Sequence, residues 1–186
     1  EIMSRPWYHD RLELTTFCSG TGPRWAERRT TIRSARGTVI EAAAVWVFVA
    51  RDRGRPVPLD EEFFAIYGEA ARDRKIRGRL QHDRPPPAIE SRPWPLRVSD
   101  FDVLDHVNNA RSLEAVEDEL ARRLPGQVPA RISVEYRGTL EHGDAVDLAS
   151  EVRATGSPDE AELAAWVLVG REVRISARIS VRGRVE

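Results

Sequence analysis

The sequence is poor in features that stabilise secreted proteins or anchor proteins in membranes. Its 186 residues include one cysteine, Cys18, which excludes an internal disulfide and any site built from several cysteines. We expect Cys18 to be a core residue. No run approaches the roughly 20 apolar residues that a membrane-spanning helix needs, and residues 1–5 resemble neither a signal peptide nor a transit peptide. A formal net charge of −1 gives no overall attraction to nucleic acid or to an anionic membrane. These absences favour a cytoplasmic protein.

Common catalytic signatures are also absent. The chain has no G-x-S-x-G elbow, no phosphate-binding P-loop and no H-E-x-x-H zinc motif, and the pair Gly20 and Gly22 lacks the third glycine of a dinucleotide fingerprint. We therefore expect no cofactor.

The first half of the chain is typical of antiparallel strands followed by a helix. Alternating apolar and polar residues predict strands over 11–18 and 25–34. Residues 39–50 are almost all apolar, which predicts a strand buried on both faces. Asp60 can cap a helix whose apolar side is formed by Phe63, Ile66 and Ala70.

A basic, proline-rich segment over residues 71–95 separates the two halves. We place a domain boundary there, giving one domain over 1–87, with a connecting helix and a basic linker at 71–87, and a second over 88–186. In the second domain a helix is expected over 109–124, with an apolar stripe of Leu113, Val116, Leu120 and Leu124. Strands are expected over 131–137, 145–153, 163–170 and 173–181.

The two halves resemble each other. Residues 9–16, HDRLELTT, are similar to residues 143–150, GDAVDLAS, and in both halves a strand with a tryptophan follows, Trp46 or Trp166. The first half lacks the strand, long helix and strand that precede residue 143. We therefore expect an α+β fold in which a sheet wraps a helix, repeated once, with the first copy incomplete at its N-terminus.

Residues 99–110, SDFDVLDHVNNA, contain the only two asparagines of the chain. Asparagine is among the best helix N-caps, and either Asn108 or Asn109 could begin the helix that follows. Capping explains one asparagine. It does not explain the second one, or the neighbouring histidine and aspartates.

This stretch resembles the D-x-D-x-x-x-H-V-N-N signature of acyl-acyl-carrier-protein thioesterases, which have two fused hotdog domains. Residues 5–32 are similar to the strand region of the first hotdog, and residues 134–144, VEYRGTLEHGD, to a Tyr and Gly-Asp turn of the second. The resemblance, closest to bacterial members, implies tandem hotdog domains, each a curved antiparallel sheet around a central helix.

The resemblance also implies a function and a site. The expected reaction is release of a fatty acid from acyl carrier protein or coenzyme A. Asp102 matches the acid that acts as general base or nucleophile, and His106 matches a histidine that positions the thioester or the water. The helix N-terminus at Asn108 and Asn109 offers amides and a positive dipole end to the oxyanion. Acyl carrier protein or coenzyme A thioesters are thus the expected partners, and a homodimer is left open.

The sequence departs from the family pattern at several positions. Plant-type members carry asparagine where this chain has Leu104, and glutamate, followed in some by cysteine, where it has Thr139 and Leu140. Asp105 and Ser112 replace a frequent glycine and a usual aromatic residue. An alternative function is therefore a catalytically impaired module that binds acyl thioesters for sensing or assembly.

Two further interpretations concern the same region. Asp100, Asp102, Asp105 and His106 could together hold a divalent metal, but acids at such spacing are common on loops and do not repeat the calcium-loop pattern, and we expect no metal. Asp100 is interpreted as a loop anchor and His142 as a structural residue before a Gly-Asp turn.

Overall fold

The computed structural model describes residues 1–50, 55–103, 105–156 and 160–183. The chain forms two compact units, Glu1–Leu80 and Gln81–Glu186. The expected boundary lay between residues 87 and 88. The structural division comes earlier because His82, Asp83 and Ile89 pack on the sheet of the second unit.

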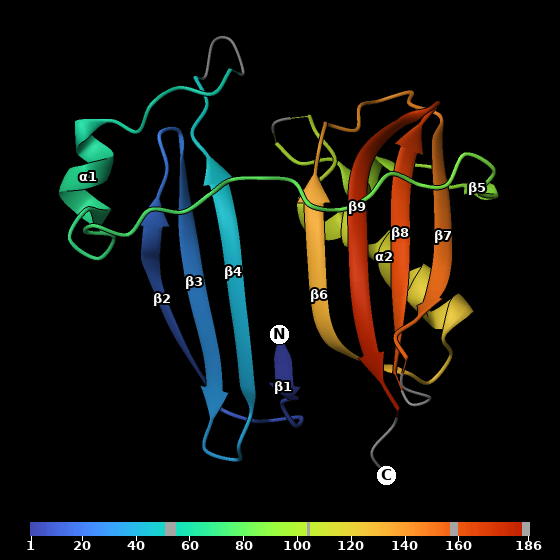
Figure 1. The fold of residues 1–186 in the computed structure, drawn as a ribbon, viewed down its shortest axis with the longest axis horizontal. Coiled ribbons are helices and arrows are strands. Elements are labelled where there is room, and N and C mark those ends of the chain that lie inside the picture. Colours follow the sequence, from blue (N-terminus) through green and yellow to red (C-terminus); the bar gives the residue numbers. More distant parts are fainter. Residues whose placement is uncertain (51–54, 104, 157–159, 184–186) are drawn as a thin grey trace. The chain divides into compact units, whose positions relative to one another are not determined.

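Unit 1 is built on a four-stranded antiparallel sheet (Figure 1). Its order is β1-β4-β3-β2, with the strands at Ile2–Ser4 (β1), Leu12–Thr21 (β2), Trp25–Ser34 (β3) and Val39–Val47 (β4). Helix α1, Glu61–Tyr67, follows. Asp60 caps this helix as predicted, because its side chain accepts the amide of Phe63 at 2.8 Å.

The core of unit 1 is small. It consists of Cys18, Ala26 and Ala71, with Leu59 and Phe63 packed against them. The prediction that residues 39–50 are buried on both faces is wrong, since the side chains of β4 are largely exposed and Trp46 is 56% exposed. The physical reason is that the short α1 is the only helix that unit 1 contains among the described residues.

Unit 2 has a five-stranded antiparallel sheet with one long helix across it (Figure 1). The sheet order is β5-β7-β8-β9-β6. The strands are Ser91–Pro93 (β5), Val128–Tyr136 (β6), Val146–Ala154 (β7), Glu160–Val169 (β8) and Glu172–Arg182 (β9). A short 3-10 turn, Val98–Asp100, precedes helix α2, Asn109–Arg123. The predicted long helix and the four predicted strands of this half are confirmed.

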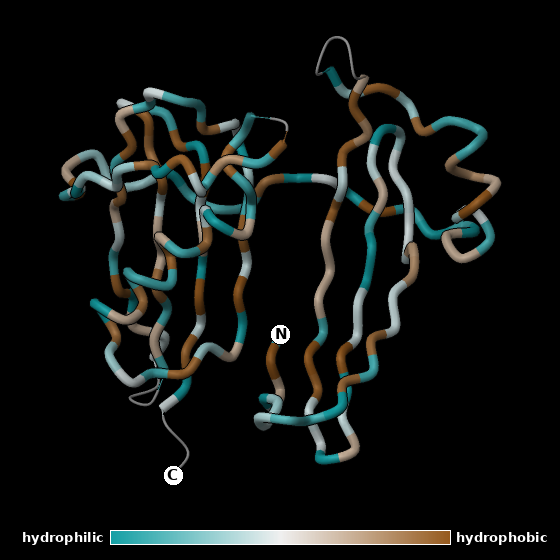
Figure 2. Tube along the Cα trace, turned by 180° about the vertical axis from the view of Figure 1, so that it is seen from behind, coloured by the Kyte–Doolittle hydropathy of each residue, from teal (hydrophilic) through white to brown (hydrophobic). Residues whose placement is uncertain are grey.

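The main core lies between α2 and one face of this sheet. Buried residues of the helix, such as Ala115 and Val116, meet buried strand residues that include Leu148, Leu163 and Val167. Leu120 and Leu124 of the predicted stripe pack at its border. Hydrophobic segments occur along the strands of both units (Figure 2). Neither helix in the described ranges is long and apolar enough to cross a bilayer.

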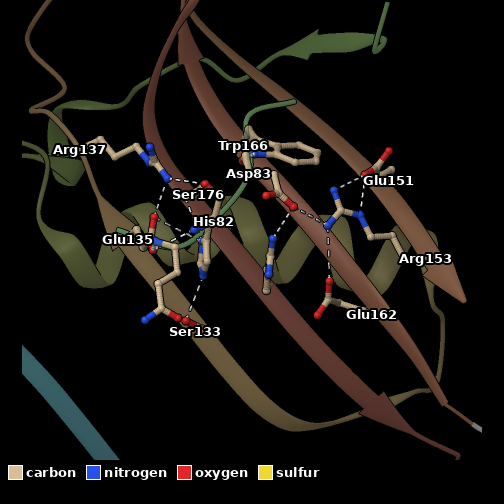
Figure 3. A network of polar contacts seen from close by, with 12 residues as sticks. His82, Asp83, Ser133, Glu135, Arg137, Glu151, Arg153, Glu162, Trp166 and Ser176 are labelled. Carbon is tan, nitrogen blue, oxygen red and sulfur yellow. Dashed lines mark hydrogen bonds and ion pairs between the residues drawn. The ribbon is translucent and has the colours of Figure 1, made fainter. Parts of the chain in front are cut away.

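The other face of this sheet is covered by the segment that enters unit 2. Figure 3 shows its contacts on the side turned away from α2. The buried Trp166 donates its indole N–H to the carbonyl of Asp83 at 2.9 Å. The ring of His82 lies between the hydroxyls of Ser133 and Ser176, each 3.0 Å away. These contacts join His82 and Asp83 to unit 2.

The resemblance between the two halves extends to the geometry of one turn. Before β2, His9 has a φ of 65°, and before β7, Gly143 has a φ of 86°. The carboxylates of the next residues, Asp10 and Asp144, each accept the amide three residues earlier at 2.9 Å. The same Asp-closed turn therefore leads into the matching strands of both units.

The tryptophans do not correspond in the same way. Trp166 lies on β8, the first strand after the matching strand β7, whereas Trp46 lies on β4, the second strand after β2. The sequence match between the halves is thus correct for the turn and the strand that follows it, and wrong for these two side chains.

Candidate active site

The described residues of the 101–107 segment, which are 101–103 and 105–107, form a loop that leads into α2. A β-bridge joins Phe101 to Val107, and the amide of Asp102 donates to the carbonyl of His106 at 2.9 Å. The amide of Asp105 donates back to the carbonyl of Asp102 at 3.0 Å. The loop therefore brings Asp102, which is half-buried, opposite the exposed His106. Leu104, which stands where plant-type members carry asparagine, lies outside the described residues.

Asp100 anchors this loop rather than lining it. The residue is buried, with 8% of its surface exposed, and its carboxylate accepts the amide of Arg97 at 2.7 Å. Its carbonyl accepts the amide of Asn108 at 2.8 Å. Asp100 thus fixes the distance between the 3-10 turn and the start of α2, in agreement with the interpretation from the sequence.

The structure distinguishes the two asparagines at the start of α2. Asn108 is the N-cap, and its side-chain oxygen accepts the amide of Ala110 at 2.9 Å. Asn109 is the first helical residue, and its carbonyl accepts the hydroxyls of Ser112 at 2.7 Å and Tyr136 at 3.1 Å. The first-turn amides and the positive end of the helix dipole therefore face the end of the loop.

The phenol of Tyr136 belongs to this end of the helix. Partial burial raises its pKa above the ordinary value, and a hydrogen-bonding contribution from Ser112 opposes this effect. Tyr136 therefore stays protonated at neutral pH and can donate to the Asn109 carbonyl. Ser112, which replaces a usual aromatic residue of the family, is buried and supports the same arrangement.

The turn after β6 borders the loop from the other side. The carbonyl of Leu140 accepts the amide of Val107 at 3.3 Å. His142 Nε2 lies 2.8 Å from Asp105 Oδ1, and the imidazole stacks on the ring of Phe101 with centroids 3.5 Å apart. His142 was interpreted from the sequence as a structural residue of its own turn. In the structure its side chain contacts the loop that carries Asp102.

Glu119 is a buried charged residue that the sequence analysis missed. It is 0% exposed, on the side of α2 that faces the sheet. Its carboxylate accepts from Arg92 Nε at 2.6 Å, from Arg122 Nη2 at 2.7 Å and from Ser150 Oγ at 2.7 Å. Burial tends to raise its pKa, but the hydrogen bonds from Arg122, Ser150 and Arg92 lower it to about 2. Glu119 is therefore ionised and ties α2 to β5 and β7.

The cavities of the two units differ in size and lining, and in unit 2 the one beside Arg92 and Arg122 measures about 360 Å³. In unit 1 a cavity of about 540 Å³ lies between the sheet and α1. Its walls are mostly apolar or aromatic and include Phe17, Trp46, Phe63, Ile66 and Tyr67. In unit 2 the space beside Asp100 and Val107 holds only about 10 Å³. No group of three or more potential metal ligands occurs among the residues that the structure describes.

Comparison with known families accounts for both units. Residues 1–67 match the acyl-ACP thioesterase N-terminal domain, and residues 85–176 match the acyl-ACP thioesterase C-terminal domain. The chain belongs to the acyl-ACP thioesterase family. A related uncharacterized protein from Mycobacterium tuberculosis strain H37Rv is 26% identical over 135 residues, which are 73% of this chain and 54% of the relative. The chain thus spans about half the length of the curated relatives it matches.

Solved structures share the fold. A putative oleoyl thioesterase from Lactobacillus plantarum superimposes with a TM-score of 0.85 at 23% identity, over 100% of this chain and 73% of that one. The 12:0-ACP thioesterase from Umbellularia californica gives a TM-score of 0.80 at 16% identity, over 98% and 70%. The expected fold class, α+β with tandem hotdog units, is confirmed.

Proposed function

We propose that this protein hydrolyses acyl thioesters, with the chemistry in the loop that leads into α2. The observation that carries the proposal is the main-chain hydrogen bond, 2.9 Å long, that sets Asp102 opposite His106 directly before a helix N-terminus. Thioester hydrolysis needs a base or nucleophile, a group that orients the reactants and donors for an oxyanion. This loop supplies all three within a stretch of eight residues, 102–109.

In the proposed reaction Asp102 acts as the general base. It takes a proton from water as the water oxygen attacks the thioester carbonyl carbon. The first-turn amides of α2 stabilise the negative charge on the carbonyl oxygen. The carbon–sulfur bond then breaks, the leaving sulfur takes the proton back from Asp102, and a fatty acid is released. His106, which is exposed to solvent, orients the water or the thioester.

The cavity of unit 1 is suited to an apolar ligand. Its volume of about 540 Å³ falls within the range of roughly 300–1,000 Å³ that is typical of small-molecule sites. Apolar and aromatic side chains dominate its walls, which suits a hydrocarbon chain.

Acyl carrier protein is the proposed donor of the acyl group, with coenzyme A as the alternative. The segment over residues 71–84 contains six basic and two acidic residues, and Arg74, Lys75 and Arg77 are exposed. A basic segment of this kind favours an acidic protein partner.

A binding module without strong hydrolytic activity is the second candidate. Thr139 stands where plant-type members have glutamate, and its hydroxyl donates to Glu141 at 3.4 Å. Leu140, where some members have cysteine, is 4% exposed and part of the core. These two positions therefore supply no ionisable group to the site.

A hydrolysis assay separates the two candidates. The protein is supplied with acyl carrier protein and coenzyme A thioesters of several chain lengths, and released thiol is measured. We expect turnover with acyl carrier protein thioesters that exceeds the rate without protein. Binding of the same thioesters without release of thiol would contradict hydrolysis and support the binding module.

A further inference from the structure

His142 makes two contacts with the loop that carries Asp102. Its Nε2 lies 2.8 Å from Asp105 Oδ1. Its ring lies almost parallel to that of Phe101, with 12° between the planes and 3.5 Å between the centroids. One side chain thus holds the loop at its start, through Phe101, and near its tip, through Asp105.

The residue that His142 contacts near the tip of the loop has a left-handed backbone conformation. Asp105 has a φ of 63°, in the left-handed region, which aspartate adopts more readily than most residues with a side chain. A residue persists there when surrounding contacts hold it. The amide of Asp105 donates to the carbonyl of Asp102, so the position of Asp105 is coupled directly to that of Asp102.

The matching turn of unit 1 shows that the turn itself does not require this histidine. Asp10 and Asp144 close the two turns with the same hydrogen bond at 2.9 Å. The position equivalent to His142 is occupied in unit 1 by Tyr8, which is 87% exposed and contacts the ring of His9. The turn therefore forms with either residue, and the contacts of His142 serve the loop.

We propose that His142 is a positioning residue, which holds the 101–107 loop through Asp105 and Phe101 so that Asp102 meets the substrate in the reactive geometry. The inference rests on the proposed function for its catalytic consequence. Its structural consequence, a loop held in one conformation, stands independently of the reaction. Misplacement of a reacting group by about 1 Å can lower a rate by about 10²-fold.

Three variants separate the two contacts. His142→Ala removes both, His142→Gln keeps a donor for Asp105, and His142→Phe keeps the stacking. We expect His142→Ala to lower kcat about 10-fold with KM nearly unchanged, and His142→Gln to recover most of the loss. Combining His142→Ala with Asp105→Ala should lower kcat no further than His142→Ala alone, because that change already removes the contact with Asp105. Tyr8→Ala in unit 1 is the matched control and should leave kcat unchanged.

Hydrogen exchange of the 101–107 segment gives a readout that does not depend on activity. The amides of Asp102, Asp105 and Val107 are hydrogen-bonded in the structure. In His142→Ala they should exchange faster than in the parent, and in Tyr8→Ala at the parent rate. Unchanged exchange, or an unchanged kcat in an active protein, would overturn the role of His142. If the parent hydrolyses no thioester but His142→Ala still exchanges faster than the parent, the proposed function is contradicted and the positioning role of His142 remains.

Discussion

The two units build the same turn and strand, but only one buries the strand's apolar face. Leu14 of β2 and Leu148 of β7 occupy equivalent positions in the matched sequences, after the same Asp-closed turn. Leu14 is 62% exposed, whereas Leu148 is 2% exposed. The difference is α2, which packs on the sheet of unit 2 and has no counterpart of its length among the described residues of unit 1. In unit 2 the helix covers the sheet and so builds a packed core, and its start borders the candidate loop.

The two ends of α2 make different contacts. At its start, Asn108 caps the first turn beside the loop of Asp102. Towards its other end, Glu119 binds Arg92 on the edge strand and Ser150 on β7. The buried ion pair fixes the helix on the sheet, and the helix in turn places the loop.

Truncating the two matched leucines tests this comparison with the largest expected effect on stability. Leu148→Ala should lower the free energy of unfolding of unit 2 by about 2–5 kcal/mol, because it leaves a cavity in a packed core. Leu14→Ala should change stability by less than about 0.5 kcal/mol, since its side chain is mainly exposed. Urea unfolding of both variants measures the difference. Equal losses would show that the two sheet faces are equally covered in solution.

Acid should destabilise unit 2 through Glu119. Its pKa is about 2 in the folded protein, against an ordinary value of 4.5 for a glutamate carboxyl. The stabilisation is therefore complete above about pH 4.5 and is lost as the pH falls towards 2. The amount is on the order of 3 kcal/mol. Melting temperatures between pH 5 and 2 should fall less steeply in Glu119→Gln than in the parent. Parallel pH profiles would remove Glu119 as the cause.

Removing the cap should have a smaller effect. Asn108→Ala should cost about 1 kcal/mol, because the amide of Ala110 loses its acceptor. Asn109→Ala should cost clearly less, since only its main-chain carbonyl makes a contact that the structure describes. Thermal unfolding of the two variants compares them directly. A larger loss for Asn109→Ala would reverse the assignment of the cap.

The basic segment of unit 1 should give the smallest change. Replacing Arg74, Lys75 and Arg77 by glutamate should raise KM a few-fold for carrier-linked substrate and leave KM for coenzyme A thioesters unchanged. The effect should weaken with salt, because charges are screened over about 8 Å at physiological ionic strength. An unchanged KM for carrier-linked substrate at low salt would speak against docking of the carrier at this segment.

The sequence predicted those features that depend on local pattern. The pattern of apolar residues located the longer strands of both units but not the short β1 and β5, and the asparagine pair located the start of α2. Glu119 was missed because an apolar stripe gives no weight to a charged residue, although Arg122 at i+3 was a signal of its pairing. The predicted burial of β4 failed because periodicity does not show whether a helix covers a sheet.

The sequence pattern could not predict contacts between residues that are far apart in the chain. The side chains of Asp105 and His142 meet although they are 37 positions apart. Neither belongs to a motif that connects them, and only the folded turn after β6 brings them together. The choice between Asn108 and Asn109 as cap likewise depended on one main-chain conformation, that of Asn108, with φ −61° and ψ 134°.

The most direct test of the account is the turnover of Asp102→Asn. The change is nearly isosteric but removes the ability to accept a proton, and general-base catalysis is worth about 10²- to 10⁴-fold. We predict a fall in kcat of that order, with a melting temperature close to that of the parent. Asp118→Asn, an exposed position on α2, is the matched control and should keep full turnover. Full turnover in Asp102→Asn would contradict the central role assigned to Asp102.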